Sequence, residues 1–111
     1  MFKSLEILGF KSFPEKIIFD FSKGLTAIVG PNGSGKSNVV DAIRWVLGEQ
    51  SFKNLRVSNL VEIIFSGNLK KPPAGFALVK AVFDNSSKIF PVDFEEIEIT
   101  RKIYRDGTSE Y

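Results

Sequence analysis

One stretch of the sequence carries residue types and a spacing that suit the binding of phosphate. It consists of Gly30, Pro31, Asn32, Gly33, Ser34, Gly35, Lys36 and Ser37, which satisfy the pattern G-x-x-x-x-G-K-[ST]. In this pattern successive backbone N–H groups converge on an anion, and the glycines permit a close approach that side chains would block. Lys36 would reach the β- and γ-phosphates, and the Ser37 hydroxyl would ligate a metal ion. The pattern therefore predicts a site for a nucleoside triphosphate, which we expect to be ATP with Mg²⁺.

The elements around this loop occur in the order that a phosphate loop requires. Residues 25–29 form a short apolar run without alternation, as expected of a strand buried on both faces. Apolar residues from Val39 to Leu47 recur at helical spacing, which predicts a helix over residues 36–47 that stops at Gly48. The alternative is a glycine-rich turn that happens to end in a lysine. The order of strand, loop and helix favours nucleotide binding.

Other elements are expected on both sides of this unit. Alternating or apolar runs predict strands at residues 5–9, 17–21, 60–65, 76–84 and 95–104. Polar or turn-forming residues predict irregular structure at residues 49–59, 66–75 and 85–87. Residues 106–111 look like one half of a hairpin.

The composition excludes several kinds of site. The chain has no cysteine and no histidine, so disulfides, zinc sites and histidine-based catalytic triads are ruled out. The net charge of +2 gives no reason to expect nucleic-acid binding from overall electrostatics. The 11 phenylalanines indicate a sheet-rich interior. There is neither a signal-peptide pattern nor an apolar run long enough to cross a bilayer, so the cytoplasm is expected.

A second part of an ATPase site is missing from the sequence. Hydrolysis needs an acidic residue that follows an apolar strand and orders Mg²⁺ and water. Asp84 follows Val82 and Phe83 in this way, but a turn comes directly after it. An aspartate that initiates a turn is the favoured interpretation. We therefore expect this chain to supply only part of an active site.

Several segments resemble SMC (structural maintenance of chromosomes) proteins. The opening LEILGFKSF at residues 5–13 resembles their first strand, and residues 24–38 resemble their Walker-A segment. The run DAIRWVLGEQS at residues 41–51 is similar to bacterial SMC heads. Residues 54–56, 64–67, 99–105 and 109–111 also match, and the weakest stretch lies between Leu69 and Asp93. One departure is Val57-Ser58, where bacterial relatives often have two glycines.

The resemblance implies that residues 1–111 form the N-terminal lobe of an ABC-type ATPase head. This is an α/β fold, with a mixed sheet around the Walker-A helix and an antiparallel β subdomain. In the family, the C-terminal part of a much longer chain supplies the signature motif, Walker B and the catalytic glutamate, and a coiled coil with a hinge lies between the two parts.

The implied function is chromosome condensation and segregation through ATP-dependent engagement of two heads and DNA binding. The complete head would be the ATPase, whereas this part alone would bind ATP without efficient hydrolysis. The implied partners are the C-terminal lobe, a second SMC head in a homodimer, DNA and kleisin-type subunits, with no membrane. The implied location is the cytoplasm, at the nucleoid.

The resemblance also gives roles to residues outside the phosphate loop. Arg56 matches the position of a proposed arginine finger that senses the γ-phosphate; otherwise it is a solvated loop arginine. Lys11 and Ser12 lie where the family places a loop near the nucleotide; otherwise they form a strand end, with Phe13 in the core. Asn38, like Asn32, either contacts phosphate or caps the turn.

Other residues near the motif have more ordinary interpretations. Asp41 suits the dipole of the predicted helix, and Trp45 is expected in the core or at a lobe interface rather than stacked on adenine. Lys53, Lys70, Lys71 and Lys80, with Arg56, form either a solvated surface or a DNA-facing patch.

Three alternatives remain open at this point. A DNA-repair ABC ATPase of the RecF or RecN kind shares the opening strand and Walker A, and only the sequence downstream would distinguish it. A small P-loop kinase or GTPase would need a substrate lid or a base-specificity motif, and the sequence has neither. The third alternative is a nucleotide-binding interaction module without catalysis.

Overall fold

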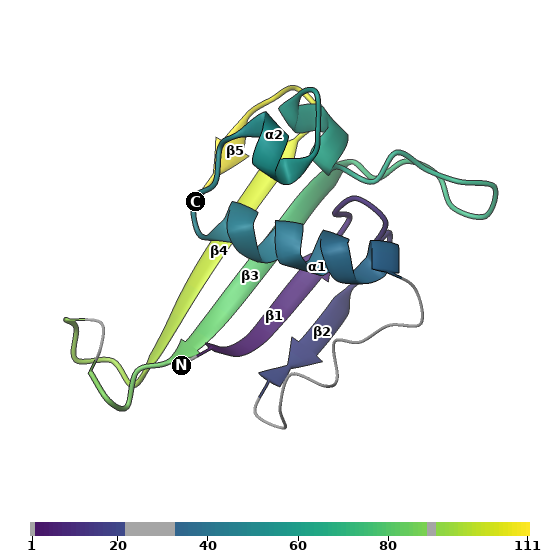
Figure 1. Ribbon diagram of the computed structural model, residues 1–111. Helices are drawn as coiled ribbons and strands as arrows, with labels where there is room; N and C mark the ends of the chain where they lie inside the picture. The colour runs from purple at the N-terminus through teal and green to yellow at the C-terminus, as the bar shows by residue number, and fades with distance from the viewer. Residues whose placement is uncertain (1, 22–32, 89–90) are drawn as a thin grey trace.

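The computed structural model describes residues 2–21, 33–88 and 91–111, which form a single antiparallel sheet with helices packed against it (Figure 1). The elements are β1 (Phe2–Leu8), β2 (Ile17–Asp20), α1 (Gly33–Val46), α2 (Phe52–Leu55), the 3-10 helix η3 (Leu60–Ile63), β3 (Phe76–Asp84), β4 (Glu96–Tyr104) and β5 (Ser109–Glu110). The strand expected at residues 25–29, and Gly30, Pro31 and Asn32 of the loop, lie outside the described residues.

The sheet has the order β2-β1-β3-β4-β5, and every pairing among these strands is antiparallel. Leu5 of β1 lies between Phe19 of β2 and Ala81 of β3, so large and small apolar side chains share one row. The strands expected at residues 5–9, 17–21, 76–84 and 95–104 are therefore confirmed, with small shifts at their ends. Residues 106–111 turn back onto the sheet, because Ser109 of β5 pairs with Ile103 of β4.

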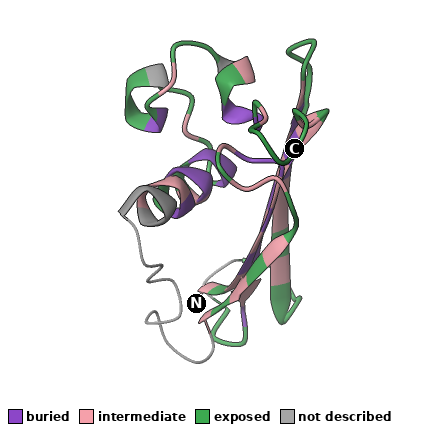
Figure 2. Cartoon of the chain, turned by 90° about the vertical axis from the view of Figure 1, so that its right-hand side faces the viewer, coloured by how far each residue is buried: buried purple, intermediate pink, exposed green. Residues whose placement is uncertain are grey.

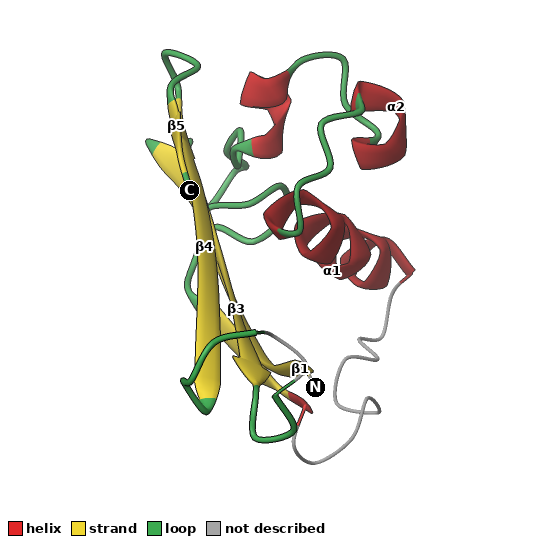
Figure 3. Cartoon of the chain, turned by 90° about the vertical axis from the view of Figure 1, so that its left-hand side faces the viewer, coloured by secondary structure: helices red, strands yellow, loops and turns green. Residues whose placement is uncertain are grey.

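The helices of the described ranges lie on one face of the sheet, and no described element covers the opposite face (Figures 2 and 3). Helix α1 crosses over the strands, while α2 and η3 lie beyond it at the upper end of the sheet in Figure 1. The inner face of β3 is apolar through Ala77, Val79 and Ala81, whereas Lys80 points the other way and is only half-buried. Residues that alternate in this way place one apolar face against α1.

Helix α1 begins at Gly33 rather than at Lys36, because tertiary context overrides the low helix propensity of the glycines. It ends at Val46, one residue before the predicted end, and Gly48 terminates it as the sequence predicts. Gly48 has φ +112, its N–H donates to the Trp45 carbonyl at 3.0 Å, and the Glu49 N–H donates to the Arg44 carbonyl at 3.0 Å. These two bonds form a Schellman motif, in which a glycine accepts a left-handed conformation at little cost.

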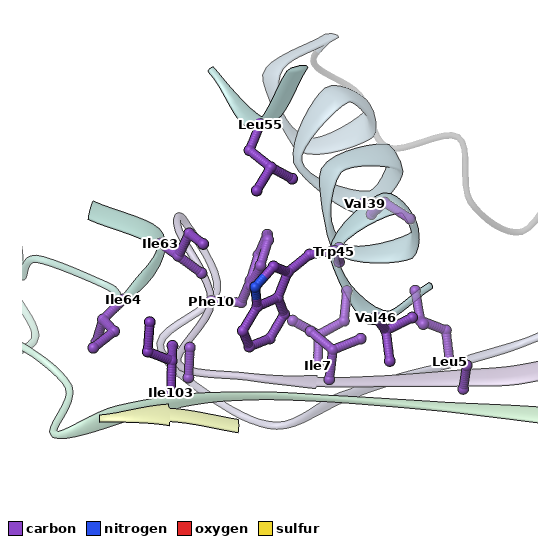
Figure 4. Packing of buried hydrophobic residues seen from close by; sticks show 14 residues of the cluster. Leu5, Ile7, Phe10, Val39, Trp45, Val46, Leu55, Ile63, Ile64 and Ile103 are labelled. Atoms are coloured by element: carbon purple, nitrogen blue, oxygen red, sulfur yellow. The ribbon is translucent and has the colours of Figure 1, made fainter. Parts of the chain in front are cut away.

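Trp45 is at the centre of the core, as Figure 4 shows. It is completely buried, and its ring centroid lies 5.6 Å from that of Phe10. Its interpretation as a core residue is confirmed. The buried cluster around it comes from all the long strands and from α1, α2 and η3, and its labelled members are Leu5, Ile7, Phe10, Val39, Val46, Leu55, Ile63, Ile64 and Ile103.

Two sequence predictions are wrong between α1 and β3. The run at residues 60–65 is not a strand, because capping starts the 3-10 helix η3 there: the Asn59 side chain accepts from the Glu62 N–H at 3.3 Å, and the Glu62 carboxylate accepts from the Ser58 N–H. The stretch at residues 49–59 is not irregular throughout, because Ser51 caps the short helix α2 by accepting from the Asn54 N–H at 3.3 Å.

Candidate functional site

The first turn of α1 is built from the second half of the phosphate-loop motif. The backbone of Gly33, Ser34, Gly35 and Lys36 is helical, so this turn presents N–H groups that have no partner within the helix. Such a helix start favours an anion through both its N–H groups and its dipole. Ser37 follows, half-buried, and lines a cleft of about 290 Å³.

Two cations meet one buried carboxylate a little further along α1. Lys11 Nζ and Arg56 Nη2 each lie 2.6 Å from Asp41 Oδ2, and Arg56 Nε lies 3.1 Å from the same oxygen. The side chain of Asp41 is 2% exposed, that of Lys11 is 11% exposed and that of Arg56 is 51% exposed. Two positive charges against one negative charge leave this group of three residues with a net charge of +1.

Polar side chains extend this group toward the opening loop. Asn38 Oδ1 accepts a hydrogen bond from Arg56 Nη2 at 3.1 Å, and Asn38 Nδ2 donates to Ser12 Oγ at 2.7 Å. Lys11 Nζ also donates to the Leu55 carbonyl at 2.6 Å. The loop after β1, helix α1 and the end of α2 thus bring together residues 11–12 and 38, expected to contact the nucleotide, and Arg56, expected to be an arginine finger.

The backbone under both cations has an unusual conformation. Lys11 has φ 49 and Arg56 has φ 57, a left-handed region that non-glycine residues rarely adopt. The Lys11 N–H donates to the Ile63 carbonyl at 2.6 Å, and the Arg56 N–H donates to the Lys53 carbonyl at 3.1 Å. Backbone strain of this kind gathers at functional sites, where the surrounding structure holds it in place. Here it brings two side chains from distant segments to one carboxylate.

A cleft of about 460 Å³ opens beside this group. Its wall is formed by Lys11, Ser12, Asn38, Arg56, Val57, Glu62, Ile64, Phe65, Ser66 and Gly67. The Glu62 carboxylate is engaged by the Ser58 N–H. Two cations, a hydroxyl and an amide on one wall are the donors that a phosphorylated ligand requires.

The remaining candidates are Asp84 and the lysines outside the site. Asp84 accepts a hydrogen bond from the Ser86 N–H at 2.9 Å, which lowers the pKa of its carboxyl group, so it initiates the turn after β3. The basic residues outside the site are spread over α2, the loop at residues 66–75 and β3. Lys71 pairs with Glu15 at 2.5 Å and Lys80 lies 3.8 Å from Glu98. Two of the lysines considered as a DNA-facing patch are therefore close to carboxylates in the part of the chain that the structure describes, and DNA contact by the set stays a prediction.

Among residues 2–21, 33–88 and 91–111, no cluster of three or more acidic side chains could hold a metal ion. None of the helices described is long and apolar enough to span a membrane.

Sequence reasoning missed the two ion pairs of Asp41, which it assigned to the helix dipole. Asn38 and Asp41 are three residues apart on α1, so they share a face of the helix. That spacing was the available signal. The two cations come from residues 30 positions before and 15 positions after Asp41, so no local pattern could reveal them.

Comparison with known proteins identifies the family. The family model for the RecF/RecN/SMC N terminal domain matches residues 1–111. The chain belongs to this family. Within it, the Chromosome partition protein Smc of Desulfitobacterium hafniense (strain Y51) is 57% identical over 109 residues, which are 98% of this chain and 9% of that protein. The Smc of Bacillus subtilis (strain 168) is 52% identical over 109 residues, with the same coverage of each chain.

Solved SMC structures have the same fold. One of them is 47% identical to this chain and has a TM-score of 0.88; its description speaks of ATP-driven dimerization and DNA stimulated activation of SMC ATPases. The match covers 97% of this chain and 66% of that one. Another is an SmcHead bound to the C-winged helix domain of ScpA, with a TM-score of 0.89 and 49% identity. This match covers 97% of this chain and 34% of that one.

These matches confirm the resemblance to SMC proteins and the fold expected of the N-terminal part of an ABC-type head. They support the SMC interpretation and not the RecF or RecN alternative. The chain spans 9% of the length of the Smc relatives named above.

Proposed function

We propose that residues 1–111 are the N-terminal lobe of an SMC-type ATPase head, and that this lobe binds ATP with Mg²⁺. The observation that carries the proposal is the convergence of Lys11, Ser12, Asn38 and Arg56 beside the first turn of α1. These groups lie on one cleft, next to the helix start that the phosphate-loop motif predicts. An anion there would meet helix N–H groups and two cations together.

Within this proposal each residue of the motif has its own role. Residues 30–35 cradle the phosphates with backbone N–H groups, Lys36 neutralises the β- and γ-phosphates, and Ser37 ligates Mg²⁺. Lys11, Ser12 and Asn38 contact the nucleotide beside the phosphate loop. Lys36 and Arg56 are the catalytic cations, since both stabilise negative charge on the transferred phosphoryl group. Bound Mg²⁺ would supply further neutralisation of the β- and γ-oxygens.

The complete protein that we infer is larger than this lobe. A C-terminal lobe completes the head and supplies the acidic residues for hydrolysis. Two such heads then engage around nucleotide, bind DNA and drive chromosome condensation and segregation in the cytoplasm, at the nucleoid. Support comes from the Smc relatives and from SMC structures described with ATP-driven dimerization, DNA stimulation and a bound ScpA domain. We infer a homodimer of heads and a kleisin-type subunit as partners.

Steady-state ATP turnover tests the division between the lobes. The chain alone, the C-terminal lobe alone and the two together would be assayed with Mg²⁺ and with or without double-stranded DNA. We expect turnover only when both lobes are present, with stimulation by DNA. Efficient hydrolysis by residues 1–111 alone would contradict the proposal of a shared site.

A further inference from the structure

Asp41 is poorly explained by the helix dipole alone. Helix α1 begins at Gly33, so Asp41 lies beyond the first turn, where the dipole no longer acts strongly. Its side chain is 2% exposed, and a carboxylate is costly to bury unless it is paired and hydrogen-bonded. The structure provides that pairing through Lys11 and Arg56, which both reach Oδ2 at 2.6 Å.

The contact fixes the orientation of the Arg56 guanidinium. Nε and Nη2 both donate to Asp41 Oδ2, so one edge of the planar group faces the carboxylate. The second N–H of Nη2 donates a hydrogen bond to Asn38 Oδ1. Among the described residues Nη1 has no hydrogen-bond acceptor, and the side chain is 51% exposed. Two N–H donors of a fixed guanidinium are thus left to meet a ligand.

We propose that Asp41 is a positioning residue, which holds Arg56 beside Lys11 so that both cations face one phosphate group in the cleft. The proposal rests on the function proposed above, because the ligand is the nucleotide of that site. Without Asp41, the long side chain of Arg56 would move among many rotamers, and two unneutralised cations would repel each other. Asp41 itself touches neither phosphate nor metal.

A double-mutant cycle in the complete protein tests this role. Asp41→Asn keeps the shape of the side chain, and Asp93→Asn makes the same charge change at an exposed residue. We expect Asp41→Asn to lower DNA-stimulated kcat about threefold to tenfold in an otherwise native protein, but less than about twofold when Arg56 is already alanine. Asp93→Asn should change neither value.

Two results of the cycle would overturn the proposal. One is an equal loss from Asp41→Asn with and without Arg56, because a purely structural role would act in both backgrounds. The other is tighter ATP binding with unchanged kcat, which would mean that Asp41 only reduces the positive charge of the cleft.

A spectroscopic measurement tests the role of Asp41 without ATP. If the whole protein neither binds nor hydrolyses ATP, the proposed function is wrong, but this measurement still shows whether Asp41 holds Arg56. The Arg56 Nε–H resonance, assigned by its loss in Arg56→Lys, should exchange slowly with solvent in the ¹⁵N-labelled protein. It should exchange at least about tenfold faster in Asp41→Asn and be unchanged in Asp93→Asn. An Arg56 signal with the same exchange rate in all three proteins would show that Asp41 does not hold the guanidinium.

Discussion

Arg56 has a left-handed backbone, with φ 57, and its side chain turns back to α1 to meet Asp41 at 2.6 Å. The sequence indicated this arginine only through the SMC resemblance, since a loop arginine has no local pattern that distinguishes a ligand-binding role. The same holds for Lys11 and Ser12. In contrast, Lys36 and Ser37 could be predicted from residue types and spacing alone. Their chemistry depends on a contiguous loop and not on distant pairing.

The left-handed backbone at Arg56 leads to a prediction on stability. Arg56→Gly should unfold at a higher urea concentration than Arg56→Ala, because glycine adopts this conformation without the cost of about 1 kcal/mol that a side chain incurs. Both variants lose the same ion pair, so their difference isolates the backbone. Equal free energies of unfolding would contradict a strained conformation at this residue.

Arg56 also carries a prediction on activity in the complete protein. Arg56→Ala should lower DNA-stimulated ATP turnover by at least about tenfold, because a cation aimed at the transferred phosphoryl group is lost. The equilibrium affinity for ATP should change much less, since Lys36 and the backbone N–H groups remain. A loss confined to ATP affinity would assign Arg56 to ground-state binding instead.

At the scale of elements, apolar periodicity was sufficient for α1 and for the long strands. It failed at residues 60–65, because a capped 3-10 turn and a buried strand end have the same apolar composition. Asn59 and Glu62 carried the capping signal there. The strand at residues 25–29 remains a prediction, because those residues are outside the described ranges.

Arg101 joins β4 to the carboxyl end of α1. Its Nη1 donates to the Trp45 carbonyl at 2.7 Å and to the Glu49 carbonyl at 3.2 Å, and its guanidinium lies between the rings of Trp45 and Tyr111. A cation at this position complements the helix dipole. It adds a second donor to the Trp45 carbonyl, which also accepts from the Gly48 N–H, and it donates to the Glu49 carbonyl just beyond the helix. The clamp therefore holds the helix that begins with the phosphate loop onto the sheet.

Replacing Arg101 should destabilise the fold without touching the proposed nucleotide site. Arg101→Met should lower the free energy of unfolding by about 2–3 kcal/mol, because two charge-assisted hydrogen bonds and two cation–π contacts are lost. Tyr111→Phe, which removes only the bond from the Tyr111 hydroxyl to the Val46 carbonyl at 2.8 Å, should cost about 1 kcal/mol. Urea unfolding measures both. An Arg101→Met variant as stable as the native chain would contradict the clamp.

The junction of α1 and α2 should respond to acid. The pKa of Glu49 is lowered chiefly by the Ser51 N–H, which donates to its carboxylate at 2.9 Å, and then by the Asn54 amide. A lowered pKa means that Glu49 contributes stability above its ordinary value of 4.5, and that this contribution is lost as pH falls through the folded-state pKa. Glu49→Gln should therefore lose less stability than the native chain between pH 6 and pH 3 in urea unfolding. Parallel pH profiles for the two proteins would contradict this.

At the scale of the whole molecule, the described residues form one layer of sheet with helices on a single face (Figure 3). The expectation that such a lobe lacks the acidic half of an ATPase site stays a prediction; the structure shows only that Asp84 accepts from the Ser86 N–H at the turn after β3. The chain resembles SMC head structures in this arrangement, with TM-scores of 0.88 and 0.89.

The most direct test is the affinity for ATP–Mg²⁺ of the head assembled from this lobe and its C-terminal partner. It shows whether residues 30–37 form the phosphate loop of that head. Equilibrium binding would be compared for the native protein, for Lys36→Ile and for Lys70→Ile, which removes the same charge from an exposed loop. We expect Lys36→Ile to weaken binding by at least about a hundredfold, because the β- and γ-phosphates lose their cation, and Lys70→Ile to leave it unchanged. Native affinity in Lys36→Ile would contradict the assignment of the loop.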